Sequence, residues 1–314
     1  MFTPKRVYGI DPIFSQFYAN PMYLNPAFAG SVRCTRMILN YRNQPYPAFG
    51  TFSTYSFSLD KHYESLSGGL GINIMHDSQA DLLSRTQAGL AYAYHGRISQ
   101  EWFVNFGVNA SYINYRLHWD NLEFPDQFNY QTGTIQPSGE LSPDNLNSHL
   151  ADFSAGILLY NESFFAGFSA SHLSQPNIDF FAEDKLPLKV SFQMGYEFFP
   201  GQSQQRHRTA EGISVTPSLI FESQAGLHRF NYGMYVNTMP VIAGVWLRQN
   251  VKHPNSLIFL LGIKQAKYRI GYSYDYSLSG YSGYGGGAHE ISVLRNFNCS
   301  DRNMKYRILN CPTF

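Results

Sequence analysis

The chain has 314 residues, of which 14% are charged and 16% aromatic, and its formal net charge is +1. This charge gives no support to a nucleic-acid-binding protein, which needs a basic face. Apolar runs such as Leu257–Ile263 are far shorter than the roughly 20 residues of a transmembrane helix. The mean hydropathy of −0.27 suits a soluble protein, but a membrane β-barrel has a similar average because lipid-facing apolar residues alternate with polar ones.

The N-terminal part has no secretory signal, since Met1–Gly9 contains no apolar run. If the protein is exported, we expect the signal to be removed or not included. Asp11–Gly30 reads DPIFSQFYANPMYLNPAFAG and combines three X-Pro steps with five aromatic residues. Proline fixes φ and keeps its predecessor out of the α region, so we expect a bent path of fixed shape.

Alternating apolar and polar residues recur along the rest of the chain. This period of two is typical of strands with one apolar face. It predicts about fourteen strands, which are Arg33–Arg42, Thr51–Asp60, Gly68–His76, Thr86–His95, Glu101–Tyr112, Leu150–Tyr160, Ser163–His172, Leu188–Phe199, Gly212–Phe221, Gly226–Val236, Val241–Arg248, Ser256–Ile263, Tyr268–Tyr276 and Ala288–Phe297.

The polar face of these strands favours a membrane barrel over a soluble sandwich. It consists mostly of Ser, Gly, Asn and Ala, which suit a crowded lumen better than bulk water. No blade-length repeat indicates a propeller. We therefore predict an all-β chain forming a single antiparallel up-and-down transmembrane β-barrel.

The connections fit the same architecture. If the first strand runs outward, the short links near 97–100, 161–162, 237–240 and 264–267 are periplasmic, and the long links 116–148, 173–187 and 277–287 are external, as in outer-membrane barrels. The link 200–211 is long for a periplasmic turn.

No motif indicates catalysis or a cofactor. The ten histidines lack metal-site spacing. His95 and His172 end strands, where packing at a membrane interface or in the lumen explains them. No G-x-S-x-G elbow is present, and the Gly-rich 277–287 has no following helix to bind phosphate. We expect no enzymatic activity, no metal and no cofactor.

The long link Arg116–Ser148 is either a solvated loop or a partner-binding loop. Aromatic side chains supply contact area at protein surfaces, and this link carries Trp119, Phe124, Phe128 and Tyr130. They are our candidate partner-binding residues.

The three cysteines leave the redox state open. Cys299 and Cys311 lie close together near the end of the chain and could form a disulfide in an oxidising compartment. Two free thiols are the alternative. Cys34 is left over in either case.

The opening segment and the strand after it resemble the PorP/SprF family, outer-membrane proteins of the type IX secretion system. The family pattern D-P-x-F-S-Q…N-P-x-x-x-N-P-A-x-A-G-S, followed by a Y-R-N-Q-W-type turn, is matched by Asp11, Pro12, Phe14, Ser15, Gln16, Asn20, Pro21, Asn25, Pro26, Ala27, Ala29, Gly30, Ser31, Arg42, Asn43 and Gln44. His289-Glu290-Ile291-Ser292 in the last strand is also similar. Pro45 departs from the pattern, in which an aromatic residue is common.

The resemblance covers essentially the whole chain and implies a non-enzymatic barrel of fourteen strands in the bacterial outer membrane. We expect residues 1–32 to form a periplasmic, lumen-bracing segment, 33–297 the barrel and 298–314 a periplasmic tail. The resemblance implies binding of the C-terminal domain of an exported cell-surface adhesin, aiding its export or tethering in gliding or adhesion.

Two other functions stay open. One is a structural anchor of the periplasmic ring, with Asp11–Gly30 and the tail Cys299–Phe314 as contact surface; a lipoprotein of the system is a further candidate partner. The other is a diffusion channel or hydrophobic-substrate transporter. Outer-membrane lipids are expected partners, and nucleic acid is not.

Overall fold

The computed structural model describes residues 11–32, 34–46, 50–129, 133–178, 180, 185–200, 212–251, 253–265, 267–278 and 287–297. Its barrel strands are β1 (Thr35–Tyr46), β2 (Gly50–Tyr63), β3 (Gly68–Gln79), β4 (Leu83–Arg97), β5 (Phe103–Leu117), β8 (Asn147–Tyr160), β9 (Phe164–Ser171), β10 (Lys189–Tyr196), β11 (Ser214–Gln224), β12 (Leu227–Thr238), β13 (Val241–Asn250), β14 (Pro254–Lys264), β15 (Tyr268–Ser277) and β16 (Ala288–Phe297).

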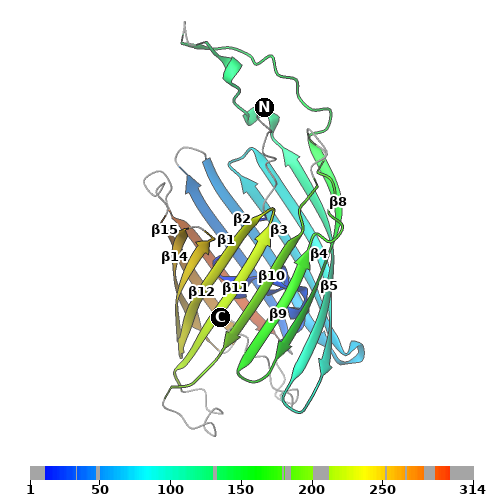
Figure 1. The fold of residues 1–314 in the computed structure, drawn as a ribbon, viewed down its shortest axis with the longest axis vertical. Helices are drawn as coiled ribbons and strands as arrows, with labels where there is room; N and C mark the ends of the chain where they lie inside the picture. Colours follow the sequence, from blue (N-terminus) through cyan, green and yellow to red (C-terminus); the bar gives the residue numbers. More distant parts are fainter. Residues whose placement is uncertain are drawn as a thin grey trace.

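These fourteen strands form one closed antiparallel barrel (Figure 1). Each strand pairs with its neighbours in the sequence of barrel strands, and β16 closes the barrel on β1. The predicted fold class and strand number are confirmed. Among the residues described, no helix has both the length and the apolar character needed to cross a bilayer.

The two faces of the strands differ sharply in polarity. Outward-facing side chains in the middle of the strands are mainly Leu, Ile, Val, Phe and Tyr, and many are exposed. Charged side chains face inward and are buried; they include Arg36, Arg42, Asp60, Asp77, Arg85, Asp152, Lys189, Glu222, Arg248, Asp275 and Glu290. An apolar exterior around a polar interior is the pattern of a membrane barrel.

The two ends of the barrel carry connections of different length. The links 118–146, 172–188 and 278–287 share one end, which we call the long-loop end. The links 64–67, 98–102, 161–163, 239–240 and 265–267 share the other, the short-turn end, where β1 begins. The three long links therefore share an end, as predicted, and 197–213 is the long exception at the short-turn end.

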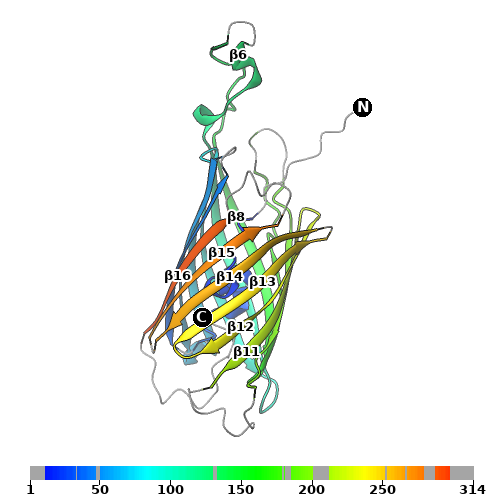
Figure 2. The same ribbon diagram turned by 90° about the vertical axis from the view of Figure 1, so that its left-hand side faces the viewer.

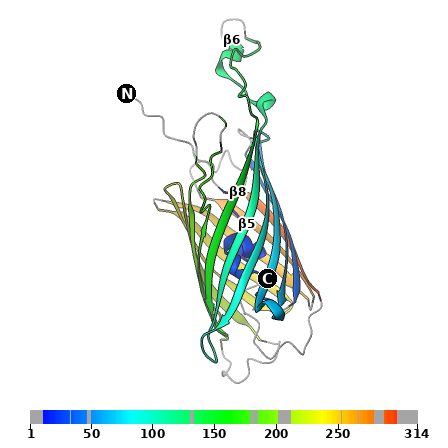
Figure 3. The ribbon, with the colours of Figure 1, turned by 90° about the vertical axis from the view of Figure 1, so that its right-hand side faces the viewer.

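The segment 11–32, which we call the lumen segment, lies inside the barrel (Figures 2 and 3, blue coil). It contains three short helical turns, η1 (Phe17–Ala19), α1 (Pro21–Leu24) and η2 (Pro26–Phe28). Pro21 and Pro26 stand at the first position of their turns, where a missing N–H costs nothing. The side chain of Asn25 accepts a hydrogen bond from the amide of Ala27 (2.9 Å) and caps the third turn.

One local prediction is wrong. The first strand was expected to end at Arg42 and to be followed by a turn at Asn43 and Gln44, but β1 continues through both residues to Tyr46. The hydropathy alternation fades there because both faces become polar. Arg42 turns inward to carboxylates, and Asn43 donates outward to the hydroxyl of Tyr41 (3.1 Å).

Candidate functional site

The lumen segment crosses the barrel from end to end. Asp11 contacts Arg85 and Lys189, which begin β4 and β10 at the long-loop end. Gly30 approaches Gly69, near the start of β3 at the short-turn end. We expected a segment that enters the barrel from the periplasmic side and braces its lumen. Buried charges at the long-loop end hold its first residue, so the segment extends along the whole lumen.

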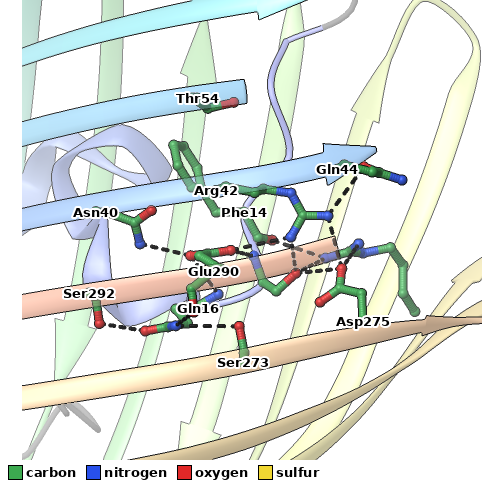
Figure 4. A network of polar contacts seen from close by, with 12 residues as sticks. Phe14, Gln16, Asn40, Arg42, Gln44, Thr54, Ser273, Asp275, Glu290 and Ser292 are labelled. Carbon is green, nitrogen blue, oxygen red and sulfur yellow. Dashed lines mark hydrogen bonds and ion pairs between the residues drawn. The ribbon is translucent and has the colours of Figure 1, made fainter. Parts of the chain in front are cut away.

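Four charged side chains of the barrel wall bind the segment at Ser15 (Figure 4). The hydroxyl of Ser15 donates to Asp275 (2.6 Å), and its amide donates to Glu290 (2.6 Å). Arg42 donates to the Ser15 hydroxyl (2.6 Å) and to Asp275 (2.9 Å). Arg248 donates to Asp275 (2.8 Å), to Ser15 (3.0 Å) and to a carbonyl of the segment.

The next residue extends this network. Both amides of Gln16 are engaged: the backbone N–H donates to the Glu290 carboxylate (3.1 Å) and the side chain donates to the Glu290 carbonyl (2.8 Å). Asn40 also donates to the Glu290 carboxylate (2.7 Å). Arg42 and Arg248 balance the charges of Asp275 and Glu290. This buried network therefore has no net charge and needs no counterion. Removing one member of such a buried set costs about 3–5 kcal/mol, because the partner charge stays buried.

A second group of charges holds Asp11. His172 lies between two carboxylates, 2.9 Å from Asp11 and 2.8 Å from Asp152. Arg85 donates to Asp11, and the Lys189 ammonium lies 3.8 Å away. Burial alone would raise the pKa of the Asp11 carboxyl, but His172, Arg85 and Lys189 hold this pKa well below its usual value. Asp11 is therefore an ionised anchor for the start of the segment.

A third polar contact fixes the exit of the segment at the short-turn end. Arg36 and Asp60 form a buried pair (2.8 Å). Asp60 also accepts from the amide of Gly30 (2.8 Å), and Arg36 donates to the carbonyl of Phe28 (3.2 Å). His95, which we expected at a membrane interface or in the lumen, faces the lumen, 2.9 Å from the carbonyl of Ala29 in the segment.

Between these polar contacts the segment packs through apolar side chains. Phe17, 5% exposed, has its ring centroid 5.1 Å from that of Trp246. Tyr18 packs against Tyr235 (5.2 Å) and Phe165 (6.3 Å) in edge-to-face geometry, which aromatic pairs prefer. Tyr23 also lies in the lumen and donates to the carbonyl of Pro12.

Glycines of the barrel wall leave room for the segment. A Cβ atom on any of them would come within 3.0 Å of an atom of the segment, which requires something to shift. They are Gly69, Gly71, Gly107, Gly156 and Gly271. Small residues were predicted to line the lumen, and at these positions they make room for the lumen segment.

The loop 118–146 has structure of its own and rises from the long-loop end (Figures 1–3). It contains η4 (Trp119–Asn121), η5 (Pro125–Gln127) and a small hairpin of β6 (Phe128–Asn129) and β7 (Thr134–Ile135). Asp126 accepts from the amide of Gly139 (2.6 Å) and from Ser138 (2.8 Å), and these bonds lower the pKa of its carboxyl.

The candidate partner-binding residues of this loop divide into two groups. Trp119 and Phe124 pack on each other, with ring centroids 4.9 Å apart. Phe128 is exposed, and Tyr130 lies outside the described residues. Sequence reasoning missed Ile135 and Leu141, which are 77% and 90% exposed. Only their apolar character inside a polar loop could have indicated them.

The cysteine prediction was wrong in one part. Cys34, which we expected to be left over, is disulfide-bonded. Cys299 and Cys311, the other two cysteines of the chain, lie outside the described residues, as does the whole predicted tail 298–314.

Within the described ranges, no three His, Cys, Asp or Glu side chains come together in an arrangement that could hold a metal ion. The lumen charges instead bind the chain's own N-terminal segment. The sequence motif included the residues of the lumen segment that make these contacts. It did not include most of their partners on the barrel wall, in particular Arg85, Lys189, Arg248 and Asp275. These four charged residues fall at the inward-facing positions of the alternating strand pattern, and this could have identified them.

Solved structures with a similar fold are outer-membrane proteins of low sequence identity. The CymD monoaromatic hydrocarbon channel has a TM-score of 0.50 and 10% identity, over 89% of this chain and 93% of that chain. A Pseudomonas aeruginosa FadL homologue has a TM-score of 0.47 and 11% identity, over 87% and 93%. Omp33 of Acinetobacter baumannii has a TM-score of 0.47 and 5% identity, over 84% and 99%.

The family comparison covers nearly the whole chain. No curated protein sequence matches it closely enough to count as a relative. The family described as type IX secretion system membrane protein PorP/SprF matches residues 7–294, a range that includes the lumen segment and thirteen complete strands with most of β16. The localisation that follows from this match and from the barrel is the outer membrane. The chain belongs to the PorP/SprF family of outer-membrane proteins of the type IX secretion system.

Proposed function

We propose that this barrel binds the C-terminal domain of an adhesin exported by the type IX system and aids its export or holds it at the cell surface. The observation that carries the proposal is the loop 118–146, which is ordered by its own hydrogen bonds yet exposes Phe128, Ile135 and Leu141. Exposed apolar side chains on an ordered projection are typical of a protein-binding surface. In this proposal the long-loop end faces the outside of the cell.

The position of the lumen segment favours a protein-binding function over a diffusion channel. Its ion pairs, hydrogen bonds and ring contacts reach strands on all sides of the barrel, from Arg42 on β1 to Arg85 on β4, Lys189 on β10 and Glu290 on β16. A diffusion channel would require the segment to leave these contacts. The similarity to a hydrocarbon channel concerns the fold alone.

The alternative role as an anchor of the periplasmic ring loses one of its two expected contact surfaces. Asp11–Gly30 was predicted to meet the ring, but residues 11–32 are almost all buried in the lumen. The tail 298–314 is outside the described residues, so this alternative now rests on the tail. Deletion of 298–314 should leave the ring components attached to the outer membrane if the adhesin-binding proposal is right.

Co-purification tests the main proposal. A tagged barrel extracted from outer membranes in mild detergent should bring down an exported protein through its C-terminal domain. The double variant Ile135→Asp, Leu141→Asp should lose it, because both changes place charge on the exposed apolar surface. The matched control is Ile98→Asp, an exposed isoleucine at the short-turn end. Equal recovery by all three proteins would contradict the proposal.

A further inference from the structure

The outward-facing side chains of β16, β1, β2 and β3 form three successive rows across the strands. Strand register defines each row, and the rows are described from mid-barrel toward the long-loop end. The first row is Val293, Leu39, Phe57 and Ile74, the second is Ile291, Tyr41, Tyr55 and His76, and the third is His289, Asn43, Ser53 and Ser78. Polarity rises from each row to the next.

A groove of about 360 Å³ lies between the first two rows, and its surface is almost wholly apolar. This volume is within the range of pockets that hold small ligands. The Tyr41 and Tyr55 rings lie 4.7 Å apart along one side, and Leu39 and Ile74 on the other side are about half exposed. The groove opens on the lipid-facing surface, so its occupant comes from the bilayer.

Hydrogen-bonding groups follow the groove toward the barrel end. Asn43 donates to the Tyr41 hydroxyl (3.1 Å). His289 lies 2.8 Å from the Tyr272 hydroxyl, and His76 lies 2.9 Å from the Thr86 hydroxyl. Amide, hydroxyl and imidazole groups suit the glycerol esters and the single phosphate of a phospholipid. None of the twelve residues in the three rows is Lys, Arg, Asp or Glu.

We propose that this groove binds one acyl chain of a zwitterionic phospholipid, with the ester and headgroup region at Asn43, His76 and His289. The order of the rows matches the order of polarity along such a lipid. A multiply phosphorylated lipid such as lipid A would call for arginine or lysine to pair with its phosphates, and the rows offer neither. The site is independent of the loop 118–146 and of the proposed function.

Native mass spectrometry of the whole delipidated barrel, with phosphatidylethanolamine added back, tests the proposal. The wild-type barrel should retain one lipid through detergent removal. Ile74→Trp, which fills the groove, should reduce its occupancy by about tenfold or more. Ile157→Trp is the matched control, because Ile157 is an exposed, outward-facing isoleucine on β8, away from the groove. Gel mobility with and without heating establishes that each variant is folded.

Three outcomes would overturn the inference. The first is a wild-type barrel that retains no phosphatidylethanolamine. The second is equal lipid loss in Ile74→Trp and Ile157→Trp, which indicates nonspecific surface lipid. The third is preferential retention of added lipid A over phosphatidylethanolamine by the wild-type barrel. Loss of phosphatidylethanolamine in Ile74→Trp, with retention in the wild type and in Ile157→Trp, supports lipid binding in the groove.

Discussion

The lumen segment and the loop 118–146 are both irregular stretches rich in aromatic residues, but they meet opposite surroundings. Phe17 in the lumen is 5% exposed, whereas Leu141 in the loop is 90% exposed. The first stretch is held by paired charges of the barrel wall, and the second mainly by hydrogen bonds within itself. The comparison teaches that aromatic content alone does not mark a binding surface. Burial assigns the first stretch to stability, whereas the second stretch stays exposed and is the surface to which we assign partner binding in our proposal.

The largest expected effect comes from removing a wall charge that binds the lumen segment. Arg42→Ala leaves Asp275 and Glu290 with fewer partners in a buried site, so it should destabilise the barrel by about 3–5 kcal/mol. Thermal unfolding in detergent, followed by gel mobility, measures this. Arg116→Ala, at an exposed outward position on β5, is the control and should change stability by less than about 0.5 kcal/mol. Equal melting of the two variants would show that the segment is not held as described.

A smaller loss of stability is expected when a wall glycine that contacts the lumen segment is replaced. Gly107→Ala places a Cβ against the backbone of Pro26 and Ala27, and overpacking of this kind costs about 1–3 kcal/mol. The lumen segment should become accessible to protease in the folded barrel. Gly96→Ala is the control, because its Cβ would meet no atom nearer than 3.3 Å. A Gly107→Ala barrel as protease-resistant as wild type would argue against close packing.

Acidification should weaken the anchor at Asp11. The folded-state pKa of Asp11 is lowered, so its contribution is present above the unfolded pKa of about 3.9. That contribution is lost as the pH falls toward the lower folded pKa. The melting temperatures of wild type and Asp11→Asn should therefore converge as the pH is lowered from about 5 to 2. A difference that stays constant with pH would contradict the ionised state of Asp11.

The loop variants should have the smallest effect on stability. Ile135→Asp and Leu141→Asp change side chains that are mostly exposed, so the free energy of unfolding should shift by less than about 0.5 kcal/mol. Binding of the exported partner should nevertheless be lost. Parallel loss of stability and binding would mean that the loop helps to hold the barrel, and the contrast with the lumen segment would fail.

Much of the fold follows from the sequence because apolar and polar side chains alternate along each strand with a period of two. All fourteen strands and the end of the barrel that carries the three long loops were predictable. The site was only half predictable. Ser15 and Gln16 belong to a recognisable motif, but their partners Asp275 and Glu290 are about 260 or more residues away. Closure of the barrel brings them together, and no local pattern encodes that distance.

Single-channel conductance of the wild-type barrel in planar bilayers tests most directly whether the lumen segment closes the lumen. We predict no stable open channel, because the lumen segment contacts the wall from Asp11 at the long-loop end to Gly30 at the short-turn end. Gly107→Ala should show brief openings as the segment loosens. A steady open conductance in the wild-type protein would contradict the account and favour the channel function.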